Sequence, residues 1–212
     1  GAVTKKSQLE LHDKEKEEDA IIDIPMSVLF EDMPPLNCSM HRAELQRFPF
    51  DTKALDLDDA ITRVLQFPCV ADKSFLITIA DRSVGGLVVR DPMVGPWQVP
   101  VADVAVTCSD FQNHAGEAFS MGERSPIALL HPAASARMAI GEALTNLAAA
   151  PIKQLSDISL SANWMGACDY STDAIGLYDA VQAVGMEMCP ALGINIPVGK
   201  DSLSMRVDWQ QN

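Results

Sequence analysis

An alanine-rich apolar segment between Pro132 and Pro151 is the feature that most constrains the fold of this chain. Proline in the first turn and proline after the last turn are typical of a single long helix with defined ends. Inside it, Glu142 and Asn146 stand four residues apart, so both side chains lie on one face of the helix. Because an unpaired carboxylate among alanines and leucines is costly to bury, we expect Glu142 to have a partner.

Helix-like and strand-like segments alternate along the rest of the chain, which indicates an α/β or α+β fold. Apolar residues recur at helical spacing over 57–65, after a capping Asp56. They recur again over 177–188, before Pro190 and Gly193, which are expected to end that helix. A Gly-Lys-Asp turn is expected near the C-terminus, between the last two predicted strands. Apolar runs predict strands at 73–80, 98–108, 126–130, 157–165, 194–198 and 202–207.

The composition limits the classes of function. The chain has 212 residues, 48% of them hydrophobic, which is enough to bury a core in one domain with an appendage or in two small domains. The net charge is −13 and the basic residues are scattered, so a nucleic-acid surface is not expected. Five widely spaced cysteines without a Cys-x-x-Cys pair indicate reduced thiols in a cytoplasmic protein. No apolar run is long enough to cross a membrane, and no secretory signal is expected.

The first 48 residues differ from the rest and predict a connector rather than a domain. Residues 5–19 form a mixed run of acidic and basic side chains, which is typical of a solvated tail. Residues 21–30 are largely apolar and could dock on a partner, and two prolines at 34–35 interrupt regular structure again. The sequence therefore predicts a connector over residues 1–48 and a domain over residues 49–212.

Three side chains with hard oxygen atoms are the candidates for a metal site. Glu142 offers a carboxylate, Asn146 offers an amide oxygen, and Asp103 interrupts a β-branched run over 99–107. Such oxygens are the ligands that Mg²⁺ prefers, and the three together are typical of Mg²⁺–phosphate binding. A polar stripe on the helix and an aspartate that faces water on an edge strand explain the same residues without a metal.

Two glycine-containing segments are further candidates for contacts with an anion. The loop at 81–97 matches neither a Walker loop nor a dinucleotide-binding fingerprint. Its Arg82 and Arg90 could clamp a phosphate or a carboxylate, or they could form salt bridges around a tight loop. In the Gly-Lys-Asp segment, Lys200 could contact a phosphate, and Asp201 could bind a metal or act as a base. A hairpin turn with solvated charges explains the same residues. No histidine pairs with a serine or cysteine in an order typical of nucleophilic catalysis.

Six segments, taken in order, resemble a single enzyme family. They are DRSVGGLVVRDPMVGPWQVPVADVAVT, GEAFSMGERSPIALL, ARMAIGEALTN, LSANWM, GLYDAV and PVGKDSLSM. Together they resemble the large, single-chain phosphoribosylformylglycinamidine synthase of purine biosynthesis over roughly residues 43–209. The resemblance implies two aminoimidazole-ribotide-synthetase-like units, each with an A and a B domain, followed by a glutaminase. This chain is similar to the second A domain, preceded by a connector that is longer and less basic than is usual in the family.

For the fold, the resemblance implies the N-terminal domain of aminoimidazole-ribotide synthetase. That domain has a mixed β-sheet packed with helices, and its sheet forms half of a β-barrel shared with the first A domain. The implied partners are the remaining domains of the same polypeptide: the first synthetase-like unit, the B domain and the glutaminase. An isolated domain would expose the strands that complete the barrel, so we expect it to self-associate, for example as a homodimer.

For the activity, the resemblance implies ATP- and glutamine-dependent amidation of formylglycinamide ribonucleotide, so the full-length protein would be an ATP-dependent C–N ligase. The catalytic histidine and the glutaminase cysteine of the family lie in other domains. We therefore expect no catalytic residue in this chain and no activity of the chain alone. The second unit is expected to hold a structural ADP through Mg²⁺. The implied metal ligands are Asp103, Glu142 and Asn146, and Ala102 and Lys73 would touch the nucleotide.

Two other interpretations remain open. A stand-alone nucleotide-binding or regulatory module would use the same motifs without catalysis. A domain with no ligand of its own would need them only for packing. The sequence also leaves open the roles of Arg82, Lys200, Asp201 and Ser202.

Overall fold

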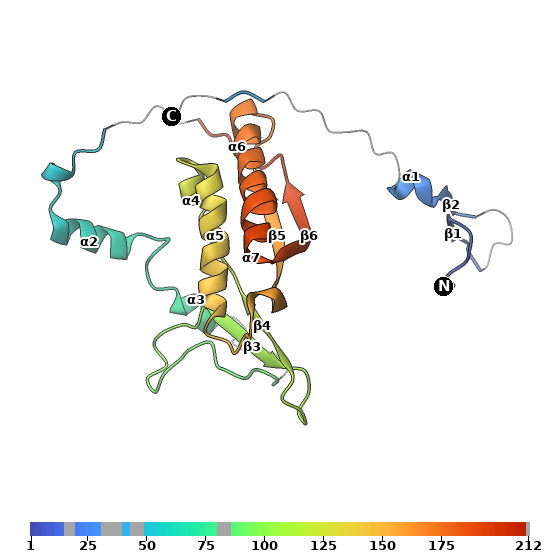
Figure 1. Ribbon diagram of the computed structural model, residues 1–212, viewed down its shortest axis with the longest axis horizontal. Helices are drawn as coiled ribbons and strands as arrows, with labels where there is room; N and C mark the ends of the chain where they lie inside the picture. Colours follow the sequence, from blue (N-terminus) through green and yellow to red (C-terminus); the bar gives the residue numbers. More distant parts are fainter. Residues whose placement is uncertain (15–19, 31–39, 43–48, 80–85, 211–212) are drawn as a thin grey trace. The chain divides into compact units, whose positions relative to one another are not determined.

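The computed structural model describes residues 1–14, 20–30, 40–42, 49–79 and 86–210 (Figure 1). The chain divides into two compact units, Gly1–Ser39 and Met40–Asn212. The boundary predicted at residue 48 adjoins residues 43–48, which lie outside the described residues, and it stays a prediction. Among the described residues, no helix combines the length and apolar character needed to span a bilayer.

The first unit contains a β-hairpin followed by a short helix. Strand β1 (Gln8–Leu11) pairs antiparallel with β2 (Ile22–Pro25), and α1 (Met26–Phe30) follows directly. The register sets Leu9 opposite Ile24, so the apolar side chains of the two strands share one face. Gln8–Leu11, part of the segment predicted as a solvated tail, therefore forms a paired strand, although its residues stay largely exposed to solvent.

The core of the second unit forms where α5 (Pro132–Leu147) packs against α6 (Ser171–Gln182) (Figure 1). The latter helix continues as a π-helical segment (Ala183–Met188) and as α7 (Cys189–Leu192). Gly193, with a φ of 66°, ends this helical stretch as predicted, whereas the proline before it lies inside α7. The buried residues at the centre of the core are Ile140, Val184, Cys189 and Ile194.

A two-stranded parallel sheet packs on this core. It pairs β5 (Ser159–Met165) with β6 (Asn195–Ser202). Leu160 and Trp164 of β5 and Ile196 of β6 pack against the buried cluster. Ser161 and Asn163, which point to the opposite face of β5, are exposed, as the alternation of a strand requires. The strand predicted at 157–165 is thus confirmed as β5.

A second, antiparallel sheet pairs β3 (Val104–Cys108) with β4 (Gly116–Ser120). On the other edge of β3, residues 87–89 add backbone hydrogen bonds of 2.8 and 2.9 Å. The first residue of β3 is buried together with the end of α5. This second buried cluster consists of Val104, Leu147 and Ala150.

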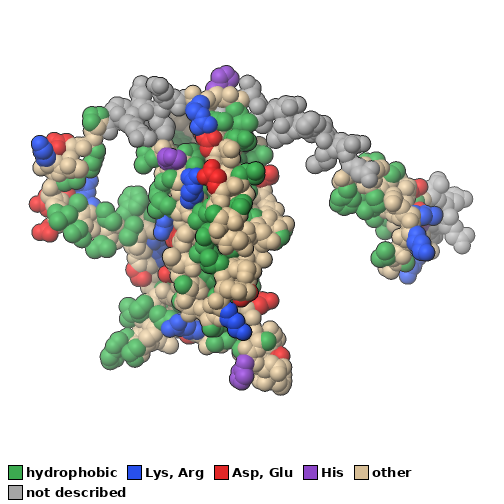
Figure 2. Space-filling model, in the orientation of Figure 1, with side chains coloured by type: hydrophobic (Ala, Val, Ile, Leu, Met, Phe, Trp, Pro, Cys, Tyr) green, Lys and Arg blue, Asp and Glu red, His purple; other side chains and the backbone are tan. Residues whose placement is uncertain are grey.

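Helix α2 (Leu57–Gln66) begins where the sequence predicts it. Asp56 caps it by accepting a hydrogen bond from the backbone N–H of Asp59 at 2.8 Å. None of its residues is buried, and its apolar side chains are exposed (Figure 2). The remaining short elements are the 3₁₀ turns Thr52–Ala54 and Leu155–Asp157 and the helices α3 (Ser74–Ile79) and α4 (Ser125–Ala128).

Two segments predicted as strands are helical. Within 73–80, residues 74–79 form α3. Asp72 accepts hydrogen bonds from the backbone N–H and the hydroxyl of Ser74 and so favours the start of a helix there. The segment 126–130 contains α4, where Pro126 occupies the first turn. In both cases a local capping or proline effect outweighs the apolar run.

The strand predicted at 98–108 begins only at Val104. Upstream of it, Gly95 and Gln98 have positive φ angles of 77° and 49°, which build a turn. The partner strand β4 is missing from the sequence prediction, because its apolar residues Ala118 and Phe119 are adjacent rather than alternating.

The predicted C-terminal hairpin is also wrong. Strand β6 runs without a turn through Gly199 and Lys200, which pair with Ala162 and Asn163 of β5. A Cβ at Gly199 would lie 2.6 Å from the carbonyl oxygen of Ala162. Glycine at this position therefore permits a close approach of two strands, and it does not form a turn.

The mixed helix and strand content agrees with the predicted fold class. Within the described residues, each sheet has two strands and is open. These small sheets do not confirm the shared half-barrel, which remains a proposal.

An ion pair joins Arg42 to α6. Its guanidinium donates to both carboxylate oxygens of Asp179, at 2.5 and 2.9 Å. Hydrogen bonding from Arg42 lowers the pKa of the Asp179 carboxyl below its ordinary value. The pair therefore stabilises the folded unit only while Asp179 is ionised.

Replacing Arg42 with glutamine should lower the Tm at neutral pH and have less effect in acid. The folded-state pKa of Asp179 lies below the unfolded value. The stabilisation is thus fully present above about pH 4 and is lost as the pH falls through the folded-state value. Circular dichroism melts of both proteins across this range measure the difference. Arg63→Gln, which removes an exposed pair with Asp59, is the control, and a Tm difference for Arg42→Gln that does not shrink in acid would contradict the assignment.

Candidate functional site

A cavity of about 270 Å³ lies between the start of β3 and the end of α5. Three of the five residues predicted for the site line it: Ala102, Asp103 and Asn146. The other lining residues are Arg90, Val94, Val104, Thr145 and Ala149. The structure thus brings a loop and the strand that directly follows it together with helix residues more than 40 positions further along the sequence.

The second buried cluster positions the two polar residues of the cavity. Asp103 directly precedes the buried Val104, and Asn146 directly precedes the buried Leu147. Because these apolar neighbours pack in one cluster, the polar side chains beside them are brought to one cavity.

The wall that carries Ala102 is a loop closed by backbone hydrogen bonds. The N–H of Ala102 donates to Pro92 O at 2.7 Å, and the N–H of Val94 donates to Pro100 O at 2.8 Å. Met93, 6% exposed, anchors the loop in the interior. This fold of the loop also places Arg90, a candidate phosphate contact, at the cavity. The other candidate arginine, Arg82, lies outside the described residues.

Asp103 is exposed, and within the described part of the chain it has no hydrogen bond or ion pair. Its carboxylate can therefore accept a cation or a donor from a ligand without first losing a protein partner. An aspartate that only faces water would have the same surroundings, so the geometry is compatible with both of the sequence interpretations.

Glu142 has the partner that its apolar surroundings demand, and that partner is an arginine. The Arg124 guanidinium lies 2.9 Å from Glu142 Oε2, and the backbone N–H of Glu123 donates to the same oxygen at 2.9 Å. Glu142 does not line the cavity but lies one helical turn before Asn146. Arg124 is absent from the sequence-based site, because no spacing rule links it to a residue 18 positions away.

Asn146 is held by the same segment that holds Glu142. Its Nδ2 donates to Met121 O at 3.1 Å. Residues Ser120–Arg124, here called the strap, run along α5 and contact it repeatedly. Ser120 Oγ donates to Ala143 O at 2.6 Å. At the other end of the strap, the buried Ser135 Oγ donates to the last strap carbonyl at 2.6 Å.

Lys73 is not brought to the cavity. It is exposed just before α3, its Nζ donates to Ala71 O at 2.9 Å, and it is not among the lining residues. The nucleotide contact predicted for it stays a prediction.

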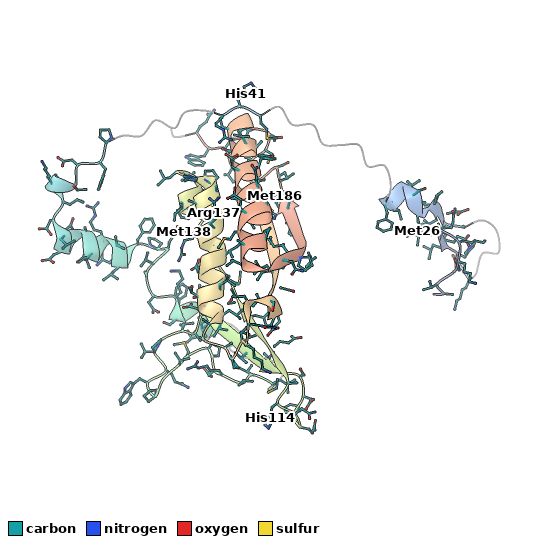
Figure 3. The ribbon with its side chains drawn as sticks, viewed as in Figure 1. Met26, His41, His114, Arg137, Met138 and Met186 are labelled. Atoms are coloured by element: carbon teal, nitrogen blue, oxygen red, sulfur yellow. The ribbon has the colours of Figure 1, made fainter. Side chains whose placement is uncertain are left out.

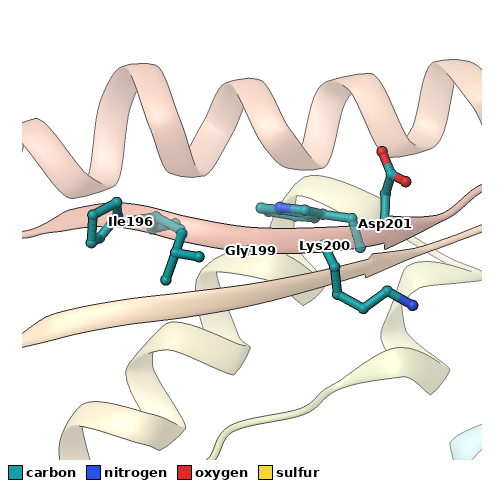
Figure 4. Close-up of a pocket in the computed structure, with 7 residues that line it drawn as sticks. Ile196, Gly199, Lys200 and Asp201 are labelled. Carbon is teal, nitrogen blue, oxygen red and sulfur yellow. The ribbon is translucent and has the colours of Figure 1, made fainter. Parts of the chain in front are cut away.

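The Gly-Lys-Asp segment lines a different, more open pocket of about 560 Å³ beside Trp164. Figure 4 shows Lys200 and Asp201 projecting from opposite faces of the strand. Lys200 Nζ donates to Ser202 Oγ at 2.6 Å. Both residues line this one pocket, and the phosphate contact considered for Lys200 and the metal contact considered for Asp201 stay predictions.

The donor chemistry of the cavity fits Mg²⁺ but is incomplete. Asp103 supplies a carboxylate and Asn146 an amide oxygen, and Glu142 is the nearest further carboxylate along the helix. Among the described residues, no group of three histidine, cysteine, aspartate or glutamate side chains is arranged to hold a metal. A cation here would therefore need ligands from a nucleotide, from water or from another domain.

The fold, with its helices packed on small two-stranded sheets, fits an N-terminal-like domain of aminoimidazole-ribotide synthetase. A family model described as "FGAR-AT PurM_N-like domain" matches residues 72–212, more than half of the 212-residue chain. The chain belongs to this domain family, which is that of formylglycinamide ribonucleotide amidotransferase. This confirms the resemblance to phosphoribosylformylglycinamidine synthase, and it connects the chain with purine biosynthesis.

Gly122 in the strap should not tolerate a side chain. A Cβ there would lie 1.8 Å from Ala139 O and 2.7 Å from Ala143 N, both backbone atoms of α5. We expect Gly122→Ala to lower the free energy of unfolding by about 1–3 kcal/mol, because the strap must move away from the helix. Urea unfolding followed by circular dichroism measures this change.

Gly141→Ala is the matched control for this substitution. Gly141 lies in α5, and a Cβ there meets nothing within 4 Å. Alanine should stabilise the helix at this position by about 0.5–1 kcal/mol. Equal effects of the two substitutions would show that the strap does not pack on the helix as described.

Proposed function

We propose that this chain is the second A domain of a single-chain phosphoribosylformylglycinamidine synthase. In the full-length protein, ATP- and glutamine-dependent amidation converts formylglycinamide ribonucleotide to formylglycinamidine ribonucleotide. Membership of the amidotransferase domain family over residues 72–212 supports this assignment. The site residues of this chain then serve binding rather than catalysis.

We propose that the cavity holds the phosphates of an ADP or ATP through Mg²⁺. The observation that carries this proposal is that Ala102, Asp103 and Asn146 line one cavity. The chain has a net charge of −13, so an anionic nucleotide needs a local cation to offset repulsion. Mg²⁺ would supply that charge, and Arg90 at the same cavity would add a guanidinium able to bind a phosphate with two hydrogen bonds.

We further propose that the open sheets pair with other domains of the same polypeptide. In the described residues, the two-stranded sheets leave strand edges without a partner strand. A neighbouring A domain that completes a barrel would cover them, with the B domain and the glutaminase as further partners. The domain would act in the cytoplasm, and in isolation it would self-associate through the uncovered strands.

Asp103→Asn should weaken Mg²⁺-dependent ADP binding by the 212-residue chain by about tenfold or more, because the amide removes the charge that offsets the cation. Isothermal titration with ADP, with and without Mg²⁺, measures this. Asp201→Asn, which changes an exposed aspartate of the other pocket, should leave the affinity unchanged. If both variants bind like the unchanged chain, the cavity is not the nucleotide site.

The 212-residue chain alone should not form formylglycinamidine ribonucleotide from ATP, ammonia and formylglycinamide ribonucleotide. We assign its polar residues to binding, and the family's catalytic groups lie in other domains. A discontinuous assay with chromatographic detection of the product measures this. Ammonia-dependent turnover by the purified chain would show that it carries a complete active site.

A further inference from the structure

The strap holds each of the two helix side chains through one atom only. On Glu142 both contacts go to Oε2, and on Asn146 the contact goes to Nδ2. In the part of the chain that the structure describes, Glu142 Oε1 and Asn146 Oδ1 have no protein partner. The two atoms that remain are both oxygens, which are the atoms that Mg²⁺ prefers.

The chemistry of the strap determines which atoms remain. The carbonyl of Met121 can only accept a hydrogen bond, so it selects the orientation of Asn146 in which Nδ2 faces the strap and Oδ1 is left over. The Arg124 guanidinium and the N–H of Glu123 can only donate, so both contact Oε2 as an acceptor and fix the side chain of Glu142.

The strap is itself fixed to the helix, which makes it able to orient other groups. Ser120 Oγ is hydrogen-bonded to a carbonyl of α5, and the carbonyl of Arg124 accepts from the buried Ser135. Between these anchors, Gly122 lies directly against the helix backbone. The donors and the acceptor that reach the two side chains therefore have defined positions.

We propose that Arg124 is a positioning residue for a divalent cation, and that the strap presents the free oxygens of Glu142 and Asn146 to that cation. This inference rests on the proposed metal site. Hydrogen bonds that orient a metal ligand through its non-coordinating atom commonly change metal affinity by about 10–100-fold. Arg124 would thus act on the cation through Glu142 without touching it.

The test is the affinity of the 212-residue chain for Mn²⁺ alone, measured by isothermal titration. Arg124→Gln should weaken Mn²⁺ binding by about tenfold, because the carboxylate loses its charged donor. Arg124→Lys keeps a charged donor and should stay within about threefold of the unchanged chain. Rescue by lysine would show that Arg124 acts through its charged donor. If Arg124 acted only by packing, the shorter lysine would not restore the affinity.

Arg137→Gln is the matched control. Arg137 lies on α5 (Figure 3). It forms an ion pair with Glu187 and not with Glu142. Its loss should lower the Tm about as much as Arg124→Gln does, since each variant removes one partly exposed ion pair. Its Mn²⁺ affinity should not change. A purely structural role for Arg124 would give the same Mn²⁺ affinity in both variants.

Each result decides the matter. Mn²⁺ binding by Arg124→Gln that equals or exceeds that of the unchanged chain overturns the positioning role while leaving the metal site intact. Absence of Mn²⁺ binding in the unchanged chain refutes the metal site, and the positioning role with it. If Arg124→Gln does not fold, Ser135→Ala carries the test, because it releases the strap end that bears Arg124. That variant should bind Mn²⁺ about threefold more weakly, and unchanged affinity would overturn the inference.

Discussion

The burial of Val104 against Leu147 and Ala150 is the contact on which the candidate site depends. It fixes the start of β3 beside the last turn of α5. Asp103 and Asn146 each directly precede one of these buried residues, so the same contact brings both to one cavity. The polar residues need no direct contact with each other for this. Their proximity follows from the packing of apolar side chains.

The parts of the fold that the sequence predicts are those set by local signals. The helix between Pro132 and Pro151 and the cap at Asp56 follow from short-range periodicity and from residues with one clear role. The failures have two causes. At 73–80 a local capping interaction outweighs an apolar run, and in β6 the parallel pairing with β5 extends a strand through Gly199, where the sequence favours a turn. The pairing of strands that lie far apart in the sequence cannot be predicted from the residues of one short segment.

The same division applies to the site. Asp103 and Asn146 could be chosen in advance, because a carboxylate in an apolar strand and a polar residue on an alanine-rich helix both contrast with their surroundings. Arg124 could not, because its role depends on the strap returning to α5, and an arginine after a Met-Gly-Glu segment has no distinctive pattern. The expectation that Glu142 needs a partner is met by this arginine, and a cation, if it binds, adds to that pairing at the other oxygen.

Several features of the second unit are explained together if the domain works inside a larger assembly. The apolar residues Leu57, Ile61, Val64 and Leu65 of α2 are between 48% and 72% exposed, although their spacing is that of a buried helix face. This helix precedes the family match, which begins at residue 72. The described sheets are open at their edges, and the cavity offers fewer ligands than Mg²⁺ requires. An uncovered helix and unpaired edges would each be covered by neighbouring protein, and one set of adjoining domains would supply both. The ligands that the cavity lacks can come from water or from a nucleotide.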